Sequence, residues 1–440
     1  MMSPFFYLAV LGAGLACGLI LGFPMSFTLG VSSIIGILVY GGPGMLGLVA
    51  SQVYSGMRDI SLLAMPLFIF IACVLERSGI ADTAYTALHQ WTGPLRGGLA
   101  IATVLCCTII AAISGVAAAG VATMGVIALP LMLKRGYNKN ITLGPIMAGG
   151  ALGVLIPPSV VFILYGMMTR TSIGRLFAGG LIPGLILACF YMAYIGVRCF
   201  FQPELGPTLP PEERVSLREK IALSKGLILP IALIFTILGS IFFGIASPME
   251  SAAVGAAGAI ACTAINRKLS WTLVKQACYR TLLINSMIMW IVFGAKCFSS
   301  VFISLGASQV LQGWLTGLEI SPIYLVFVMQ STYLILGCIV DEVTMMCLTV
   351  PVYAPILAAL GFDPVWFGVL FMINMQIGYL TPPFGYCLFY MKGVAPPGIT
   401  MVDIYRSIGP FIALAFCALL LVMFFPQLAL WLPETFFALM

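Results

Sequence analysis

Apolar runs close to the length of a bilayer crossing recur along the whole chain, for example at residues 5–21, 61–75, 181–197, 227–243 and 411–425. A helix needs roughly 20 residues to cross the hydrocarbon core of a bilayer. Because 61% of the 440 residues are hydrophobic and only 8% are charged, a single core surrounded by water could not hide this much apolar surface. The sequence therefore predicts an all-α polytopic membrane protein.

One long polar segment, residues 202–225, is rich in charged residues and prolines. We interpret it as a surface linker between two membrane halves, residues 1–201 and 226–440. Cytoplasmic loops of membrane proteins carry an excess of Lys and Arg, and a cytoplasmic linker places most of the 20 Lys and Arg residues on its own side. We therefore predict a cytoplasmic linker, and we attribute the net charge of +6 to membrane orientation rather than to nucleic-acid binding.

The two halves share a pattern of glycines, prolines and tyrosines at one constant offset. It pairs Pro130 with Pro355, Gly153 with Gly378, Pro157-Pro158 with Pro382-Pro383, and Tyr165 with Tyr390. The basic residues do not repeat, since Lys134, Arg135 and Lys139 correspond to Ala359, Leu360 and Pro364. Only the first copy therefore has the basic residues that are typical of a cytoplasmic loop. This difference predicts two repeats of inverted topology, as in many secondary transporters.

Each half contains a long apolar segment with a small or polar turn in its middle. In the first half this segment is near residues 97–133 and turns near Ser114-Gly115, and in the second it is near 322–357 and turns near 337–341. The two arms of such a segment begin and end on the same side of the membrane. Each segment therefore predicts a re-entrant helical hairpin.

Each half also contains a helix interrupted by two prolines, near residues 144–168 at Pro157-Pro158 and near 364–391 at Pro382-Pro383. Proline has no amide donor and blocks the hydrogen bond one turn back. The carbonyls freed in this way cannot face lipid. They can face a cavity, where they are good ligands for a hard cation.

Ionisable residues inside apolar stretches are the remaining candidates, because charge within a bilayer is costly and tends to be functional. For Asp341, at the second predicted turn, we favour a functional role. Glu250 could serve the substrate or could join one helix to another. For Lys296 we favour a side chain that reaches toward the membrane surface or pairs with an acid over one that contacts the substrate. With Ser159, which follows the first proline pair, these residues are the candidates for substrate binding or coupling.

Several short motifs together resemble the large membrane subunit of tripartite ATP-independent periplasmic (TRAP) transporters, in the ion transporter superfamily, nearly from end to end. The motifs are Pro66-Leu67-Phe68, Ser78-Gly79-Ile80, Ser114-Gly115, Gly136-Tyr137, residues 153–159, residues 247–252, Gly337 with Asp341, and Gly378 with Thr381-Pro382-Pro383. The first hairpin differs from the family's usual Ser-Gly-Ser, because it reads Ser114-Gly115-Val116.

The resemblance implies an elevator-type transporter in the bacterial inner membrane, with sodium as the coupling ion and no other cofactor. It implies the import of organic acid anions, such as sialic acid or C4-dicarboxylates, delivered by a periplasmic substrate-binding protein. A small four-helix membrane subunit would be the second partner. Carried over motif by motif, one sodium site would use Ser114, Gly153, Ile156 and Pro158, and the other Gly337, Gly378, Thr381 and Phe384.

Three other classes of protein are weighed against this prediction. A stand-alone sodium- or proton-coupled dicarboxylate or citrate transporter of similar inverted fold would need no partner proteins, and the long motif match disfavours it. An intramembrane enzyme is disfavoured because the chain has one histidine and therefore no HExxH metal motif. A purely structural subunit is disfavoured because broken helices at membrane depth serve no purpose without a cavity.

Overall fold

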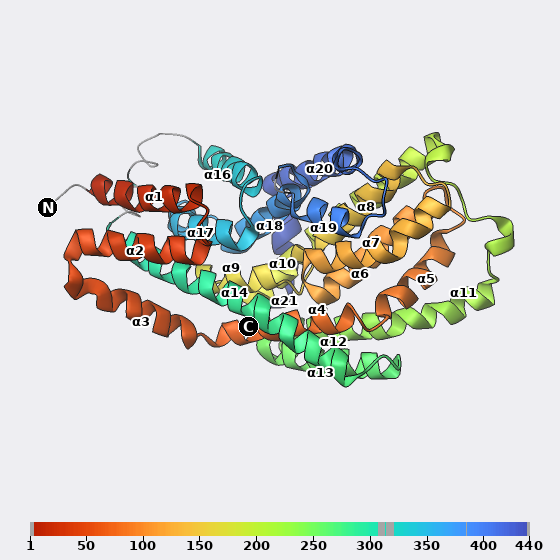
Figure 1. Cartoon of the computed structure of the whole chain (residues 1–440), viewed down its shortest axis with the longest axis horizontal. Helices are drawn as coiled ribbons and strands as arrows, with labels where there is room; N and C mark the ends of the chain where they lie inside the picture. Colours follow the sequence, from red (N-terminus) through yellow and green to blue (C-terminus); the bar gives the residue numbers. More distant parts are fainter. Residues whose placement is uncertain (1–3, 307–312, 314–320, 384, 438–440) are drawn as a thin grey trace.

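The computed structural model describes residues 4–306, 313, 321–383 and 385–437, and the regular elements within these ranges are all helices (Figure 1). Within the described residues, seven helices are long and apolar enough to cross a membrane, and the bent pair Pro43–Met57 and Ile60–Leu75 makes an eighth if it is one span. The prediction of an all-helical, polytopic membrane protein is confirmed.

The first half contains ten α-helices: α1 (Pro4–Ile20), α2 (Met25–Gly41), α3 (Leu46–Met57), α4 (Ala64–Leu75), α5 (Ile80–Thr92), α6 (Gly98–Ser114), α7 (Ala117–Lys134), α8 (Lys139–Ala151), α9 (Val160–Thr169) and α10 (Ile173–Phe201). The linker contains α11 (Leu217–Ser224). The described part of the second half contains α12 (Ile228–Phe242), α13 (Pro248–Ile265), α14 (Trp271–Ser304), α16 (Pro322–Gly337), α17 (Glu342–Ala359), α18 (Pro364–Leu380), α19 (Tyr386–Val394), α20 (Met401–Phe424) and α21 (Gln427–Phe437).

One set of helices, α1–α4 and α12–α14, packs together and is called the scaffold group below. Within it α14 contacts α2, α3 and α4, and α13 packs on α4 and α12. Small residues allow the close approach that membrane helices use, since a Cβ on Gly294 of α14 would lie 2.8 Å from the carbonyl oxygen of Ser26 in α2. The scaffold group thus comprises the first two helices of each half, α1, α2, α12 and α13, together with α3, α4 and α14.

The second set, α6–α10 and α16–α20, is called the hairpin group. Hairpin one (α6 and α7) packs on α8, and α16 of hairpin two (α16 and α17) packs on α18. Helix α20 contacts α8 and α18 and so joins the two halves. The two groups meet where α4 contacts α6 and α9, where α12 contacts α6 and α10, and where α14 contacts α17.

The long helix α10 shows that the two hairpins open at opposite ends of the molecule. It has 29 residues and is therefore roughly 43 Å long. At its C-terminal end, Arg96 at the base of hairpin one donates to the carbonyl oxygen of Phe200 over 3.1 Å. At its N-terminal end, Arg175 pairs with Asp363, just after hairpin two, with 3.5 Å between Nη2 and Oδ2. This inversion agrees with the repeat predicted from the loop charges.

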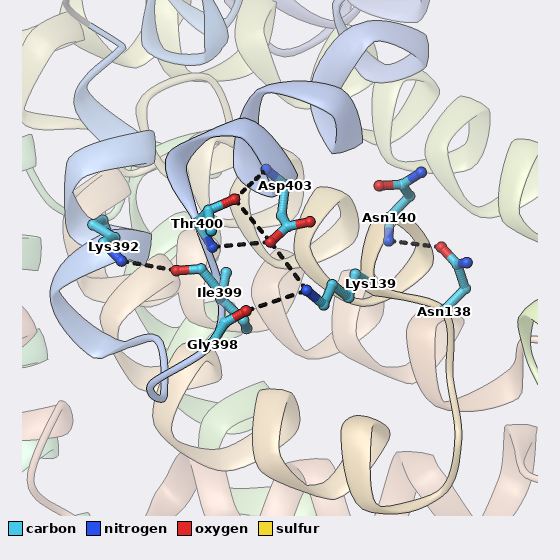
Figure 2. Close-up of polar contacts among 8 residues, drawn as sticks. All are labelled: Asn138, Lys139, Asn140, Lys392, Gly398, Ile399, Thr400 and Asp403. Atoms are coloured by element: carbon cyan, nitrogen blue, oxygen red, sulfur yellow. Dashed lines mark hydrogen bonds and ion pairs between the residues drawn. The ribbon is translucent and has the colours of Figure 1, made fainter.

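The start of α8 and the end of α19 lie at one end of the hairpin group, in the cluster of polar contacts drawn in Figure 2. Lys139, the first residue of α8, donates to Asp403 over 3.0 Å and to the Gly398 carbonyl oxygen over 3.2 Å. Lys392, near the end of α19, donates to the carbonyl oxygen of Ile399 over 2.8 Å. These contacts fix the loop between α19 and α20 against α8.

At the opposite end, the hydroxyl of Tyr165 in α9 donates to the carbonyl oxygen of Pro364 at the start of α18 over 3.0 Å. The broken helix of the first half therefore runs from the Lys139 end to the Tyr165 end, and its counterpart runs the other way. The two interrupted helices are antiparallel, and their breaks lie in the middle of the hairpin group.

Candidate functional site

The tip of hairpin one is seated on the first helix break. A Cβ on Gly153 would lie 2.9 Å from the carbonyl carbon and oxygen of Val116, so only glycine fits there. Gly115 has a φ of +63°, and a Cβ on it would overlap the carbonyl oxygen of Pro158. The structure therefore brings together Gly153, Pro158 and the tip, three parts of the site predicted from the sequence.

Ser114 ends α6 at this tip and is buried. Its Oγ has no hydrogen-bond partner among the residues that the structure describes. Ile156 is also buried within the break, and its amide donates to the Leu152 carbonyl oxygen over 2.9 Å. Ser159 has a local structural role as the N-cap of α9, where its hydroxyl accepts from the Phe162 amide at 3.5 Å.

The tip of hairpin two approaches the second break in a similar way. A Cβ on Gly378 would lie 3.3 Å from both the Cα and the carbonyl oxygen of Gly337. Thr381 begins the break, and its hydroxyl donates to the Ile377 carbonyl oxygen over 2.7 Å. Phe384, the fourth predicted member of this site, lies outside the described residues. The structure thus brings Gly337 and Gly378 into contact, and their role in a sodium site stays a prediction.

Asp341 lies at the tip of hairpin two, where the sequence analysis expected it. Its carboxylate caps α17 by accepting from the Thr344 amide at 3.0 Å. The adjacent Glu342 interacts through its side chain with Tyr379 of α18. These two acids therefore hold the hairpin tip in shape and fix it to the interrupted helix.

Glu250 and Lys296 lie elsewhere in the scaffold group. Glu250 is exposed in the first turn of α13, where it forms a capping box with Ser247, and the structure does not bring it to either tip. Lys296 of α14 pairs with Asp59 at the bend between α3 and α4, with 3.1 Å between Nζ and Oδ2. Of the two interpretations left open for Lys296 by the sequence, the structure shows the pairing with an acid, and that acid is Asp59.

Gln376 joins the two broken helices and was missed by the sequence analysis. The turn at Leu152–Val154 leaves the Ala151 carbonyl without the amide that it would meet in a continuous helix, because the Leu155 amide donates to Leu152 instead. The fully buried Gln376 side chain of α18 donates to this carbonyl over 2.6 Å. The sequence could have indicated this contact, because an amide side chain within the otherwise apolar segment 364–380 needs a hydrogen-bond partner.

A second buried amide holds hairpin two against α18. Asn374 donates from Nδ2 to both the carbonyl oxygen and Oε1 of Gln330 in α16, at 2.9 Å each. Since Asn374 and Gln376 are two residues apart, they face different sides of the helix. Helix α18 is thus linked by side-chain amides to hairpin two on one side and to the first half on the other.

Two clefts lie where the scaffold group meets the hairpin group. One, of about 310 Å³, lies between the tip of hairpin one and helices α4 and α14, and it is lined by Val116, Glu76 and Arg280 among others. The other, of about 710 Å³, is lined by residues that include Asp59 and Arg170. Asp59 and Glu76 lie just before and just after α4, so the clefts are at its opposite ends.

Inverted hairpins that meet antiparallel broken helices within a membrane-spanning fold define a secondary transporter of the inverted-repeat class. The family model for the tripartite ATP-independent periplasmic transporter, DctM component, matches residues 13–428. The chain belongs to this family, as a large permease subunit.

Relatives along nearly the whole length support this assignment. The C4-dicarboxylate TRAP transporter large permease protein DctM of Pseudomonas aeruginosa is 32% identical, over 92% of this chain and 94% of that protein. The ectoine/5-hydroxyectoine TRAP transporter large permease protein UehC of Ruegeria pomeroyi is also 32% identical, over 96% of this chain and 97% of that protein. The crystal structure of the YdaH transporter of Alcanivorax borkumensis is similar with a TM-score of 0.65 at 14% identity, over 97% of this chain and 98% of that chain. This last similarity concerns the fold alone.

Proposed function

We propose that this chain is the permease of a sodium-coupled, three-component transporter that imports small carboxylate-bearing molecules across the bacterial inner membrane. The observation that carries the proposal is the pair of hairpin tips seated on two antiparallel helix breaks. Irregular backbone at membrane depth is tolerated where it lines a cavity or binds an ion. The tips and breaks supply this backbone twice, in inverted copies.

Two sodium ions would bind where each tip meets its break. The first site would use Ser114, Gly153, Ile156 and Pro158, and the second Gly337, Gly378 and Thr381 with Phe384. The buried, unpartnered Oγ of Ser114 is a neutral oxygen that fits a monovalent cation. The Thr381 hydroxyl donates its proton to Ile377, which leaves its lone pairs for an ion. The C-terminal ends of α8 and α18 add partial negative charge at both places.

Transport would occur by an elevator movement, in which the hairpin group slides as one body against the scaffold group. The contacts of Gln376 and of Asn374 tie the hairpin group internally. The clefts at the two ends of α4 lie along the boundary on which such a movement would take place. On the orientation predicted from the basic loops, the cleft beside Arg280 is the cytoplasmic one.

The substrate class follows from the relatives, which are named for C4-dicarboxylates and for ectoine. These molecules share a carboxylate group, and the organic acid anions expected from the sequence, including sialic acid, share it too. The partners would be the other two parts of the tripartite system, a small four-helix membrane subunit and a periplasmic substrate-binding protein that selects the ligand.

Reconstitution tests this proposal. The chain would be placed in proteoliposomes with the small subunit and binding protein of its own system, and uptake of radiolabelled succinate and ectoine would be measured in sodium and in potassium buffer. We expect uptake of at least one of them that needs sodium and the binding protein. Equal uptake in potassium buffer would refute sodium coupling, and full uptake by the chain alone would identify a stand-alone transporter.

A further inference from the structure

The cleft of about 310 Å³ beside hairpin one has two chemically different walls. The wall on the side of the hairpin group consists of the tip and the first turns of α7, with the apolar side chains of Val116, Ala118, Ala119 and Ala122, and of Tyr390 in α19. The opposite wall belongs to the scaffold group and contains Glu76 and Arg280. All charged side chains that line this cleft in the described structure therefore come from the scaffold.

Hairpin one still offers polar atoms at its tip. Among the described residues, no side chain caps the N-terminus of α7 at Val116, so the first amides of this helix are available to an anion. Ser114 lines a small adjoining pocket that shares Glu76 and Ala119 with the cleft, and its buried Oγ has no partner among the described residues. These groups can hydrogen-bond a carboxylate, but they provide no full positive charge.

Arg280 provides that positive charge, and some of its N–H donors have no hydrogen bond to other described residues. Its Nη1 donates to both carboxylate oxygens of Glu76, at 3.1 and 2.9 Å. An Arg guanidinium has five N–H donors, and Nη2 and Nε of Arg280 have no hydrogen bond to other described residues. The Arg280 side chain is also 50% exposed. A second carboxylate can therefore reach it without displacing a buried group.

We propose that Arg280 receives the carboxylate of the transported molecule while the tip of hairpin one faces this cleft. The proposal rests on the function proposed above and names a specificity-determining residue for it. Because Arg280 belongs to the scaffold group, the substrate meets it in one position of the hairpin group and leaves it in the other. A group that binds substrate in only one state favours that state when substrate is present.

Four variants in the reconstituted three-component system test this assignment, with whichever of labelled succinate or ectoine the wild-type system imports. Arg280→Gln removes the charge and should lower kcat/KM by about tenfold or more. Arg280→Lys keeps the charge but loses the fork of donors, so its KM should rise about threefold or more. Arg77→Gln removes a charge next to Glu76 that does not line this cleft, and its uptake should stay within about twofold of wild type.

Glu76→Gln separates a substrate contact from a structural ion pair. If the pair only joined α4 to α14, Glu76→Gln and Arg280→Gln would lose uptake equally, and this result would overturn the proposal. If Arg280 meets the substrate, Arg280→Gln lowers uptake far more than Glu76→Gln does, because only Arg280 contacts the carboxylate.

Wild-type uptake by Arg280→Gln would also overturn the assignment and leave the proposed function intact. A wild-type system that imports neither probe would overturn both. Should Arg280→Gln fail to insert, an unchanged KM in Arg280→Lys would overturn the assignment.

Discussion

Gln376→Leu tests how the two halves of the hairpin group are joined. Leucine has a similar size but removes the amide that donates to the Ala151 carbonyl over 2.6 Å. Because the Gln376 side chain is 0% exposed, water cannot take its place. A buried acceptor left without a partner costs about 1–3 kcal/mol. The Gln376 Oε1 has no hydrogen-bond partner among the described residues, so removing this buried acceptor offsets part of that cost. We therefore expect the free energy of unfolding to fall by about 1 kcal/mol.

Thermal unfolding of the purified chain with its small subunit, titrated with sodium against potassium, provides the assay. A loss of this size should lower the melting temperature by about 2 °C. The Ala151 carbonyl lies just before the first break and Gln376 just before the second, so the variant should also make the sodium dependence less steep. Asn374→Leu is the matched control, since among the described residues the hydrogen bonds of this amide go only to hairpin two. The Asn374→Leu variant should lower the melting temperature but leave its dependence on sodium concentration as steep as in the wild type.

Two results would contradict this reasoning. A Gln376→Leu protein with the wild-type melting temperature and sodium curve would show that the buried hydrogen bond contributes nothing. An equal loss of steepness in Asn374→Leu would show that damage anywhere in α18 disturbs sodium binding, so that the link between the halves has no special role.

Three further predictions concern the breaks and the topology. Thr381→Val keeps the side-chain shape and removes the hydroxyl, so sodium-driven uptake should need a higher sodium concentration while the protein still inserts. Gly153→Ala should destabilise the protein by about 1–3 kcal/mol, and Gly378→Ala by less, because the tip backbone lies 2.9 Å from the first added Cβ and 3.3 Å from the second; equal melting temperatures would contradict this. Cysteines at Arg135 and Asp363 should react with impermeant maleimide from opposite sides of the membrane, and labelling from one side would rule out the inversion.

The hairpins and breaks could be predicted from the sequence because their causes are local. Proline removes a hydrogen bond wherever it lies in a helix, so each diproline located a break to within a few residues. The turn predicted near Ser114-Gly115 lies between α6 and α7, since Gly115 adopts the positive φ that ends α6. The turn predicted at 337–341 lies between α16 and α17.

Contacts between distant residues could not be predicted with the same certainty. The pairs Gln376–Ala151 and Lys296–Asp59 depend on how helices cross. The sequence shows that Gln376 and Lys296 need a polar partner, but it does not identify that partner. Glu250 is a different case, because a Ser three residues before a Glu is the pattern of a capping box. Reading Ser247 and Glu250 in this way would have placed the Glu at the start of a helix.

The composition of hairpin one determines where the charge for an anionic substrate must come from. The family's usual Ser-Gly-Ser offers a second hydroxyl where this chain has Val116, and the residues that follow are alanines. Burying a carboxylate against such a surface is costly unless it is paired. Among the described residues that line the cleft, the positive charge is on Arg280, across the boundary between the two helix groups. Substrate recognition in this chain would therefore be divided between a moving part and a fixed part. Substrate affinity would then depend on the position of the hairpin group as well as on bound ions.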